Sequence, residues 1–173
     1  MPFKIPPFLI KKIFPPKKAV STIDTNSDGS PDAIQLKAIN KFQPFTIPEN
    51  IDLGSFDINE FDLSEWGEIL LDGEPIDISR KNVDTNFVRD NLTIYHQGDA
   101  FRLDDFLSGK AGGRVLGLGD ALTVVLKLEM KYIEQLTEGE HELTIDLDTI
   151  PTITVEFELT PTHMNIPFDP ENL

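Results

Sequence analysis

The sequence predicts a mainly β protein, an antiparallel β-sandwich with an extended N-terminal arm. Apolar residues alternate with polar ones in several rows, Gly and Asn/Asp turns separate the rows, and no strand–helix–strand repeat is present. A chain of 173 residues is long enough to bury a core. We divide it into a basic, proline-rich arm at 1–20, a sandwich domain at 21–160 and a C-terminal tail at 161–173.

The arm is rich in prolines, apolar residues and lysines. Its prolines are Pro2, Pro6, Pro7, Pro15 and Pro16. Proline fixes the backbone and lacks an amide donor, so we expect an extended, polyproline-like path outside the sheets. The apolar side chains between the prolines need a partner surface. Two partners remain open, the body of the same chain and another protein chain docked through residues 1–18, and we prefer the second.

The N-terminus carries no convincing targeting or membrane segment. Its short apolar run, Phe8 to Ile10, is broken by prolines, and no small-residue cleavage site follows it. We therefore expect neither a signal peptide nor a membrane span.

The strand predictions follow the period-two rows. The clearest rows lie at 34–38, 122–130, 143–147 and 153–159, and each needs one buried face. Shorter strands are expected at 68–71 and 75–78 around the turn Asp72-Gly73, and at 92–95 before the turn Gln97-Gly98. Short helices are expected only near 104–108 and 132–136.

A candidate metal loop lies between the arm and the first clear strand. Over residues 24–32, oxygen side chains occupy positions 1, 3, 5 and 9, and Gly29 occupies position 6. Calcium prefers six to eight oxygen ligands, and glycine allows the sharp turn that wraps the ion. The predicted ligands are the side chains of Asp24, Asn26, Asp28 and Asp32, with the carbonyl of Ser30. Position 12 is the neutral Gln35, which excludes an EF-hand.

This loop resembles the D-x-[DN]-x-D-G-x-x-D loops of integrin-type and thrombospondin-type calcium repeats. In those repeats the ninth-position Asp, here Asp32, closes the shell. The resemblance implies Ca²⁺ as the bound cofactor. The alternative interpretation is a solvated turn, because Asp, Asn, Ser, Gly and Pro are also the ordinary turn residues.

Charge is divided unequally along the chain. The net charge is −15, but the first twenty residues hold five lysines and no acid, so residues 21–173 carry a net charge of −20. A body this acidic repels phosphate, so we expect no nucleic-acid partner except through the arm. The acidity suits a salt-rich or calcium-rich medium. The chain has no cysteine, which excludes disulfides and thiolate chemistry.

Catalytic residues are sparse. His96, Asp99 and Ser108 have the residue types of a Ser/His/Asp triad. Nothing like a nucleophile elbow, however, surrounds Ser108 in the sequence. We interpret them as surface polar residues and predict that the protein is not an enzyme.

One stretch carries a family resemblance. The sequence Gly-Glu-His-Glu-Leu-Thr-Ile at 139–145 resembles the penultimate strand of bacterial and archaeal immunoglobulin-like modules. More loosely, the order of features from 69 to 147 is similar to the small β subunit of C-glycoside deglycosidases, an accessory sandwich that assembles with a larger catalytic subunit. The resemblance implies an immunoglobulin-like β-sandwich, and it transfers no site residues.

These observations together favour a non-enzymatic structural protein, a calcium-braced sandwich that docks into a larger assembly through its arm. A virion or an extracellular cell-surface layer is the expected location. Two alternatives remain open. One is a non-catalytic accessory subunit of a multi-subunit enzyme, and the other is a calcium-dependent adhesion module.

Overall fold

A computed structural model of the chain describes residues 5–49, 62–79, 86–148 and 150–173. The protein is mainly β, and in the described ranges its strands pair antiparallel except for β1 and β12, which pair in parallel. The predicted β class is therefore confirmed.

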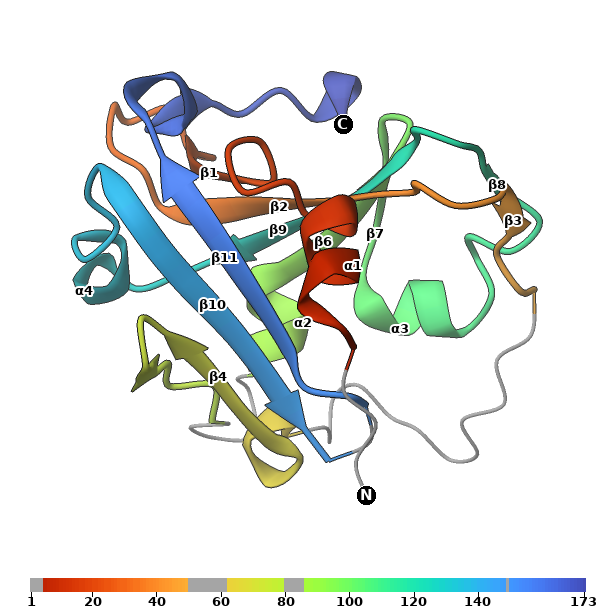
Figure 1. The fold of residues 1–173 in the computed structure, drawn as a ribbon, viewed down its shortest axis with the longest axis horizontal. Coiled ribbons are helices and arrows are strands. Elements are labelled where there is room, and N and C mark those ends of the chain that lie inside the picture. The colour runs from red at the N-terminus through yellow and green to blue at the C-terminus, as the bar shows by residue number, and fades with distance from the viewer. Residues whose placement is uncertain (1–4, 50–61, 80–85, 149) are drawn as a thin grey trace.

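Within the described residues, the strands form two larger sheets and one small ribbon (Figure 1). The first sheet has the spatial order β12 (Ile166–Pro167), β1 (Val20–Asp24), β2 (Ala33–Ile39), β9 (Ala121–Lys127), β6 (Leu92–His96) and β7 (Asp99–Phe101). The second has the order β11 (Ile153–Leu159), β10 (Gly139–Leu147), β4 (Gly67–Leu71) and β5 (Glu74–Pro75). The ribbon pairs β3 (Phe45–Thr46) with β8 (Val115–Leu116).

The helices in the described residues are short. They are α1 (Pro7–Ile13), α2 (Phe87–Asn91), α3 (Leu103–Leu107) and α4 (Met130–Ile133), with 3₁₀ turns η1 (Leu63–Glu65), η2 (Pro161–His163) and η3 (Pro170–Asn172). Helices α3 and α4 overlap the two predicted helical segments. No helix in the described part of the chain has the length and apolar character that a membrane crossing requires.

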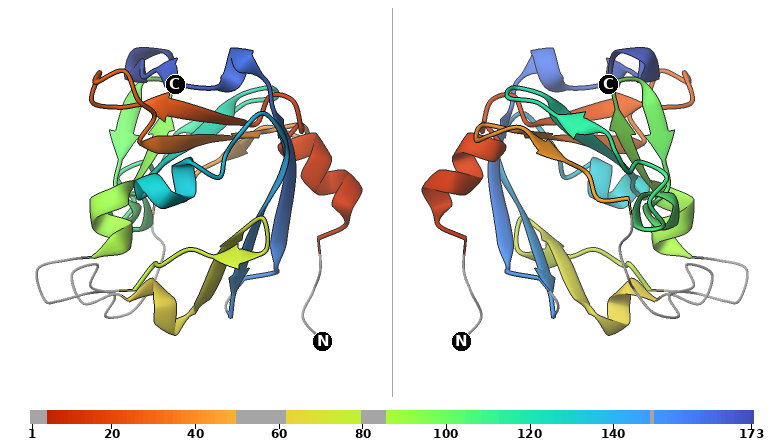
Figure 2. Two further views of the ribbon diagram at one scale, coloured as in Figure 1. Left: turned by 90° about the vertical axis from the view of Figure 1, so that its left-hand side faces the viewer. Right: turned by 90° about the vertical axis from the view of Figure 1, so that its right-hand side faces the viewer.

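The main hydrophobic core lies between the two larger sheets. Leu36 and Leu126 from the first sheet belong to one cluster with Leu143, Val155 and Phe157 from the second. Figure 1 shows β10 and β11 running across β2 and β9, and the views in Figure 2 show the two sheets as separate layers. Val124, Leu126 and Leu128 of the row at 122–130 therefore share one core with Val155 and Phe157 of the row at 153–159. Leu122 packs instead against a separate cluster that contains Phe101. The first row ends early, because Met130 begins α4 and is 50% exposed.

Both predicted hairpin turns are present. Asp72 and Gly73 have φ of 51° and 81°, and Gln97 and Gly98 have φ of 51° and 86°. Two successive residues with positive φ are the signature of the type I′ turn, whose twist matches that of the flanking strands. These turns fix the registers of β4 with β5 and of β6 with β7.

The N-terminal arm differs from the prediction. Residues 7–13 form helix α1 instead of an extended path, because Pro7 occupies the first turn, where a missing amide donor costs nothing. Ile10 is buried in the main core, and Ile5 and Phe14 pack against it. Helix α1 lies beside β11 of its own chain (Figures 1 and 2). The arm thus packs on its own body, the first of the two partners that the sequence leaves open.

The predicted C-terminal tail at 161–173 is also joined to the body. Ile166 and Pro167 pair in parallel with Ile23 and Asp24 of β1. Ile166, Phe168 and Leu173 pack against a second small cluster that contains Ile23 and Tyr95. The open edge of β1 is therefore covered by the tail, and the boundary at 160 does not separate two structural units.

Candidate functional site

The predicted calcium loop connects β1 to β2 and is folded around its own side chains. Asp24 ends β1 and is 8% exposed. Its Oδ1 accepts a hydrogen bond from the amide of Asp28 at 3.3 Å, and its Oδ2 accepts one from the amide of Gly29 at 2.8 Å. Gly29 has a φ of 89°, which favours glycine at this turn.

The next two alternate positions repeat this arrangement. Asn26 Oδ1 accepts from the amide of Asp28 at 3.2 Å, and Asp28 Oδ1 accepts from the amide of Ser30 at 2.9 Å. Side chains at positions 1, 3 and 5 thus bond to amides of the same turn, as Asx turns do. The structure therefore brings Asp24, Asn26 and Asp28 together on one short loop.

Asp32 has a different role in the structure. Its two carboxylate oxygens accept from the amide and the hydroxyl of Thr25, at 2.8 and 2.5 Å, and so tie the two ends of the loop together. In the described part of the chain, no group of three or more His, Cys, Asp or Glu side chains is placed to hold a metal ion. Calcium binding by this loop stays a prediction.

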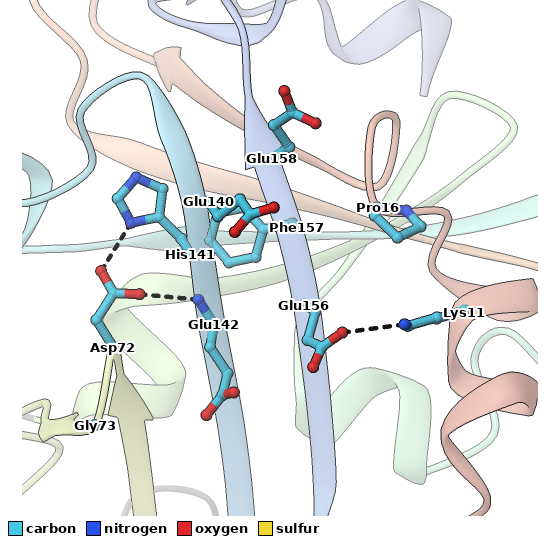
Figure 3. Close-up of a pocket in the computed structure, with 10 residues that line it drawn as sticks. All are labelled: Lys11, Pro16, Asp72, Gly73, Glu140, His141, Glu142, Glu156, Phe157 and Glu158. Carbon is cyan, nitrogen blue, oxygen red and sulfur yellow. Dashed lines mark hydrogen bonds and ion pairs between the residues drawn. The ribbon is translucent and has the colours of Figure 1, made fainter.

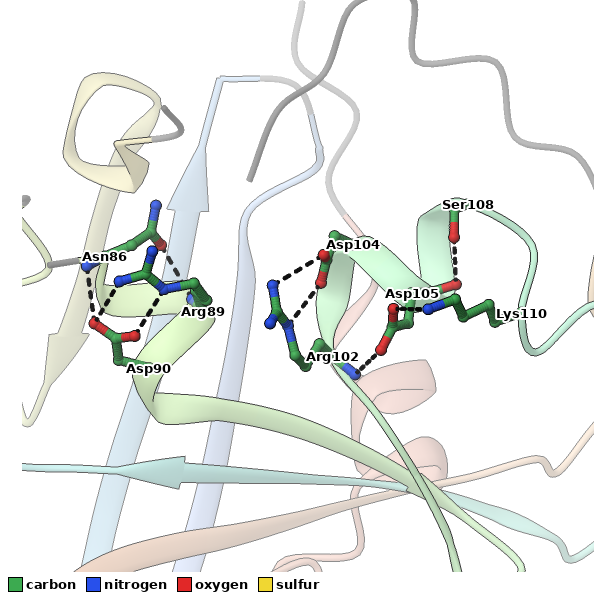
Figure 4. Close-up of polar contacts among 8 residues, drawn as sticks. All are labelled: Asn86, Arg89, Asp90, Arg102, Asp104, Asp105, Ser108 and Lys110. Atoms are coloured by element: carbon green, nitrogen blue, oxygen red, sulfur yellow. Dashed lines mark hydrogen bonds and ion pairs between the residues drawn. The ribbon is translucent and has the colours of Figure 1, made fainter. Parts of the chain in front are cut away.

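The Ser/His/Asp arrangement does not form. Ser108 Oγ donates to the carbonyl of Asp105 at 3.0 Å, a local bond at the end of α3 (Figure 4). The ring of His96 contacts Arg114 instead. Lys110 lies 2.6 Å from Asp105, and this hydrogen bond holds the pKa of that carboxyl below its ordinary value.

Helix α2 is held by a reciprocal cap at its start, also drawn in Figure 4. Asn86 Oδ1 accepts from the amide of Arg89 at 3.0 Å, while Asp90 Oδ2 accepts from the amide of Asn86 at 2.9 Å. The Arg89 side chain and the Asn86 amide lower the pKa of Asp90. These hydrogen bonds cap the first turn of α2 and stabilise it.

A groove of about 700 Å³ lies where the arm meets β10 and β11 (Figure 3). Its acidic lining comes from two pairs that are directly opposite across the strands, Glu140 with Glu158 and Glu142 with Glu156. Like charges in such positions repel each other. Lysines of the arm offset this repulsion, because Lys11 pairs with Glu156 at 3.2 Å and Lys17 reaches Glu158 at 3.9 Å.

The side chain of His141, which is 6% exposed, closes one side of the groove. His141 Nδ1 is 2.7 Å from Asp72 Oδ2, and its Nε2 is 2.6 Å from the carbonyl of Thr137. The other oxygen of Asp72 accepts from the amide of Glu142 at 2.8 Å. The ring stacks on Phe157, with centroids 5.6 Å apart. Asp72 thus links the β4–β5 turn to β10.

These polar contacts are not among the sequence-based predictions. A signal for the lysine–glutamate pairs was available, since glutamates alternate along 140–142 and 156–158 while the arm is rich in lysine. The link between Asp72 and His141 had no such signal, because 69 residues separate them.

Comparison with known proteins finds no family model that matches this chain and no curated protein that matches it. Functional inference therefore rests on the fold and on the side chains described above.

Proposed function

We propose that this protein is a non-enzymatic structural protein, an immunoglobulin-like β-sandwich braced by Ca²⁺ at residues 24–32, which docks into a larger assembly such as a virion or a cell-surface layer. The observation that carries the proposal is the folding of the 24–32 loop. Three alternate oxygen-bearing side chains already fold over it through hydrogen bonds to amides.

The chemistry of this loop supports a cation. An ionised carboxylate offers about four lone-pair sites. Asp24 and Asp28 each use one or two of these for amides, so acceptor capacity remains on both. Asn26 and the Ser30 carbonyl add neutral oxygens, which suit calcium as a hard cation.

The position of the loop explains why bracing it would matter. The loop joins β1 to β2, and the carbonyl of Gly29 accepts from Asn165 Nδ2 of the C-terminal segment at 3.0 Å. An ion held at 24–32 would therefore tie the first hairpin and the segment before β12 into one rigid unit. Such rigidity suits a structural role.

The exposed side of α1 is the proposed docking surface. Ile10 faces the core, whereas Phe8 is 62% exposed and Lys12 is exposed to solvent. This side is basic, and the remainder of the chain carries a net charge of −20. Complementary charge steers association between proteins, so a further copy of the acidic body is a suitable partner for it.

Calcium titration during thermal unfolding tests the bracing. Binding to the native state alone stabilises by RT ln(1 + [L]/Kd), about 2.7 kcal/mol at a hundredfold excess of ligand. We expect calcium to raise the melting temperature of the native chain and of Glu138→Ala, an exposed acidic residue outside the loop. Asp28→Ala should abolish the rise. A native chain whose melting temperature ignores calcium contradicts the proposal.

Sedimentation at increasing protein concentration tests the docking. The native chain should associate at low salt, and Lys12→Glu should weaken this association because it reverses charge on the exposed side of α1. Lys41→Glu, the same change at an exposed lysine elsewhere, should leave association unchanged. A chain that stays monomeric at every concentration, or equal losses in both variants, contradicts docking through α1.

A further inference from the structure

His96 ends strand β6 and is 2% exposed. Its Nδ1 lies 3.2 Å from Nη1 of Arg114. A guanidinium group can only donate hydrogen bonds, so Nδ1 must accept, and the proton of the neutral ring is on Nε2. Nε2 is buried and has no hydrogen-bond partner among the described residues. His96 is thus a buried titratable group in one forced tautomer.

Arg114 makes several contacts with the β6–β7 hairpin at once. Its Nη1 also lies 3.4 Å from the carbonyl oxygen of His96, and its Nη2 pairs with the carboxylate of Asp99. The guanidinium carbon is 5.0 Å from the centroid of the Phe101 ring. His96 and Asp99 are directly opposite in the hairpin register. The Arg114 side chain therefore connects the segment before β8 to both strands of the β6–β7 hairpin.

We call residues 111–116 the flap. The flap is continuous with the β3–β8 ribbon, because the amide of Ile47 donates to the carbonyl of Arg114 at 2.8 Å and the amide of Gly113 donates to the carbonyl of Ile47 at 3.0 Å. Ala111 of the flap is fully buried in a cluster with Ile47 and Phe101. The contacts of Arg114 thus hold a cover over a small hydrophobic cluster.

We propose that His96, Arg114 and Asp99 form a pH-sensitive latch, which holds the flap closed at neutral pH and releases it in acid. Protonation of His96 removes the acceptor that Nδ1 offers to Arg114. It also places a second positive charge beside the guanidinium in a buried site, where a charge is costly unless it is paired. The same protonation costs far less once the flap has opened and water reaches the ring.

The surroundings of His96 in the closed flap favour the neutral form of its ring. Burial lowers the pKa of His96, and the neighbouring charge of Arg114 lowers it further, while Asp120 and Asp99 act in the opposite sense. Arg114 acts on the ring from the flap, Asp99 from β7, and Asp120 from the segment before β9. Because the closed form has the lower pKa, the latch contributes fully above the ordinary value of 6.5 and is lost as the pH falls toward the lowered value.

Amide hydrogen exchange measures the latch directly. The amides of Ile47 and Gly113 should be protected at pH 7.5 and lose protection at pH 5, after each rate is divided by the intrinsic exchange rate at that pH. Between the ordinary and the lowered pKa of His96, the protection of these amides should fall by about tenfold per pH unit. The amides of β10 and β11 serve as the reference and should keep their protection. Equal flap protection at both pH values overturns the proposal.

A variant without a titratable ring at position 96 tests whether His96 causes the pH dependence of flap protection. His96→Gln keeps an oxygen acceptor for Arg114, so its flap protection should not depend on pH. His163→Gln is the matched control, since His163 contacts Ser21 and lies outside the latch, and this variant should still lose flap protection in acid. Loss of protection in His96→Gln equal to that of the native chain overturns the proposal.

The unmodified protein supplies an independent measurement. The ring signals of His96 in an NMR titration should shift at a pH below 6.5. A midpoint above 6.5 overturns the latch, whether or not the His96→Gln variant folds.

Discussion

Nζ of Lys11 lies 3.2 Å from a carboxylate oxygen of Glu156, and this ion pair joins helix α1 to strand β11. A second attachment lies at the end of the arm, where the carbonyl of Pro16 accepts from the amide of Glu158 at 2.8 Å. Both side chains of the ion pair are about half exposed, so it contributes only about 0–1 kcal/mol. The packing of Ile10, Ile5 and Phe14 on the main core must therefore supply most of the free energy that holds the arm in place.

The first prediction concerns Ile10. Because its side chain is buried in the main core, Ile10→Ala should lower the free energy of unfolding by about 2–5 kcal/mol, measured by urea denaturation. Phe8→Ala, at an exposed position of the same helix, should change it by no more than about 0.5 kcal/mol. Similar small effects at both positions would show that α1 does not pack on the body.

The second prediction concerns the charge of the arm. Lys11→Gln should lower the free energy of unfolding by at most about 1 kcal/mol in low salt. The difference should vanish near 1 M salt, where the Debye length is about 3 Å and exposed charges are screened. A difference that persists in high salt would indicate that Lys11 acts through packing of its aliphatic stem.

The third prediction concerns Phe157, which is 2% exposed in the main core. Phe157→Ala should cost about 3–5 kcal/mol of unfolding free energy, as loss of a buried aromatic ring does. The neighbouring Glu156→Gln should cost no more than about 1 kcal/mol, because that side chain faces solvent and makes only an exposed ion pair. Equal costs would mean that the register of β11 is wrong.

The fourth prediction concerns Asp72. Asp72→Ala removes the acceptor of both the His141 ring and the Glu142 amide, and leaves a buried ring nitrogen without its partner. We expect a loss of about 1–3 kcal/mol in urea denaturation. Glu140→Gln, an exposed change in the same groove, is the control and should have little effect. A neutral Asp72→Ala would show that the link between the turn and β10 is dispensable.

The fifth prediction concerns pH. Hydrogen bonding to Lys110 lowers the pKa of Asp105 below 3.8, so the stability that this group contributes is complete above pH 3.8 and is lost as the pH falls through the lowered value. Asp105→Asn should therefore be less stable than the native chain at pH 7, and this difference should shrink below pH 3.8. A difference in melting temperature that stays constant with pH would contradict the role of the ion pair.

Much of the fold is encoded locally. The alternation at 153–159 predicts a strand with one buried face, since successive side chains of a strand point to opposite sides, and Val155 and Phe157 are buried as expected. The dipeptides Asp72-Gly73 and Gln97-Gly98 predict hairpin turns, because glycine adopts the positive φ of such turns without steric cost. The grouping of Asp24, Asn26 and Asp28 on one loop follows from sequence spacing alone.

The tertiary structure decided which residues far apart in the sequence come into contact. Pro7 is compatible with an extended arm and with a first helical turn, and the helix is the conformation in which Ile10 is buried in the main core. The parallel pairing of Ile166 with Ile23, and the meeting of Arg114 with His96 and Asp99, depend on which strand edges and faces come together. The sequence by itself determined the strands with clear alternation, the hairpin turns and the spacing of oxygen side chains on the 24–32 loop, because these depend on neighbouring residues. Only packing in three dimensions decided where the arm lies and which charges meet, because these contacts join segments far apart in the chain.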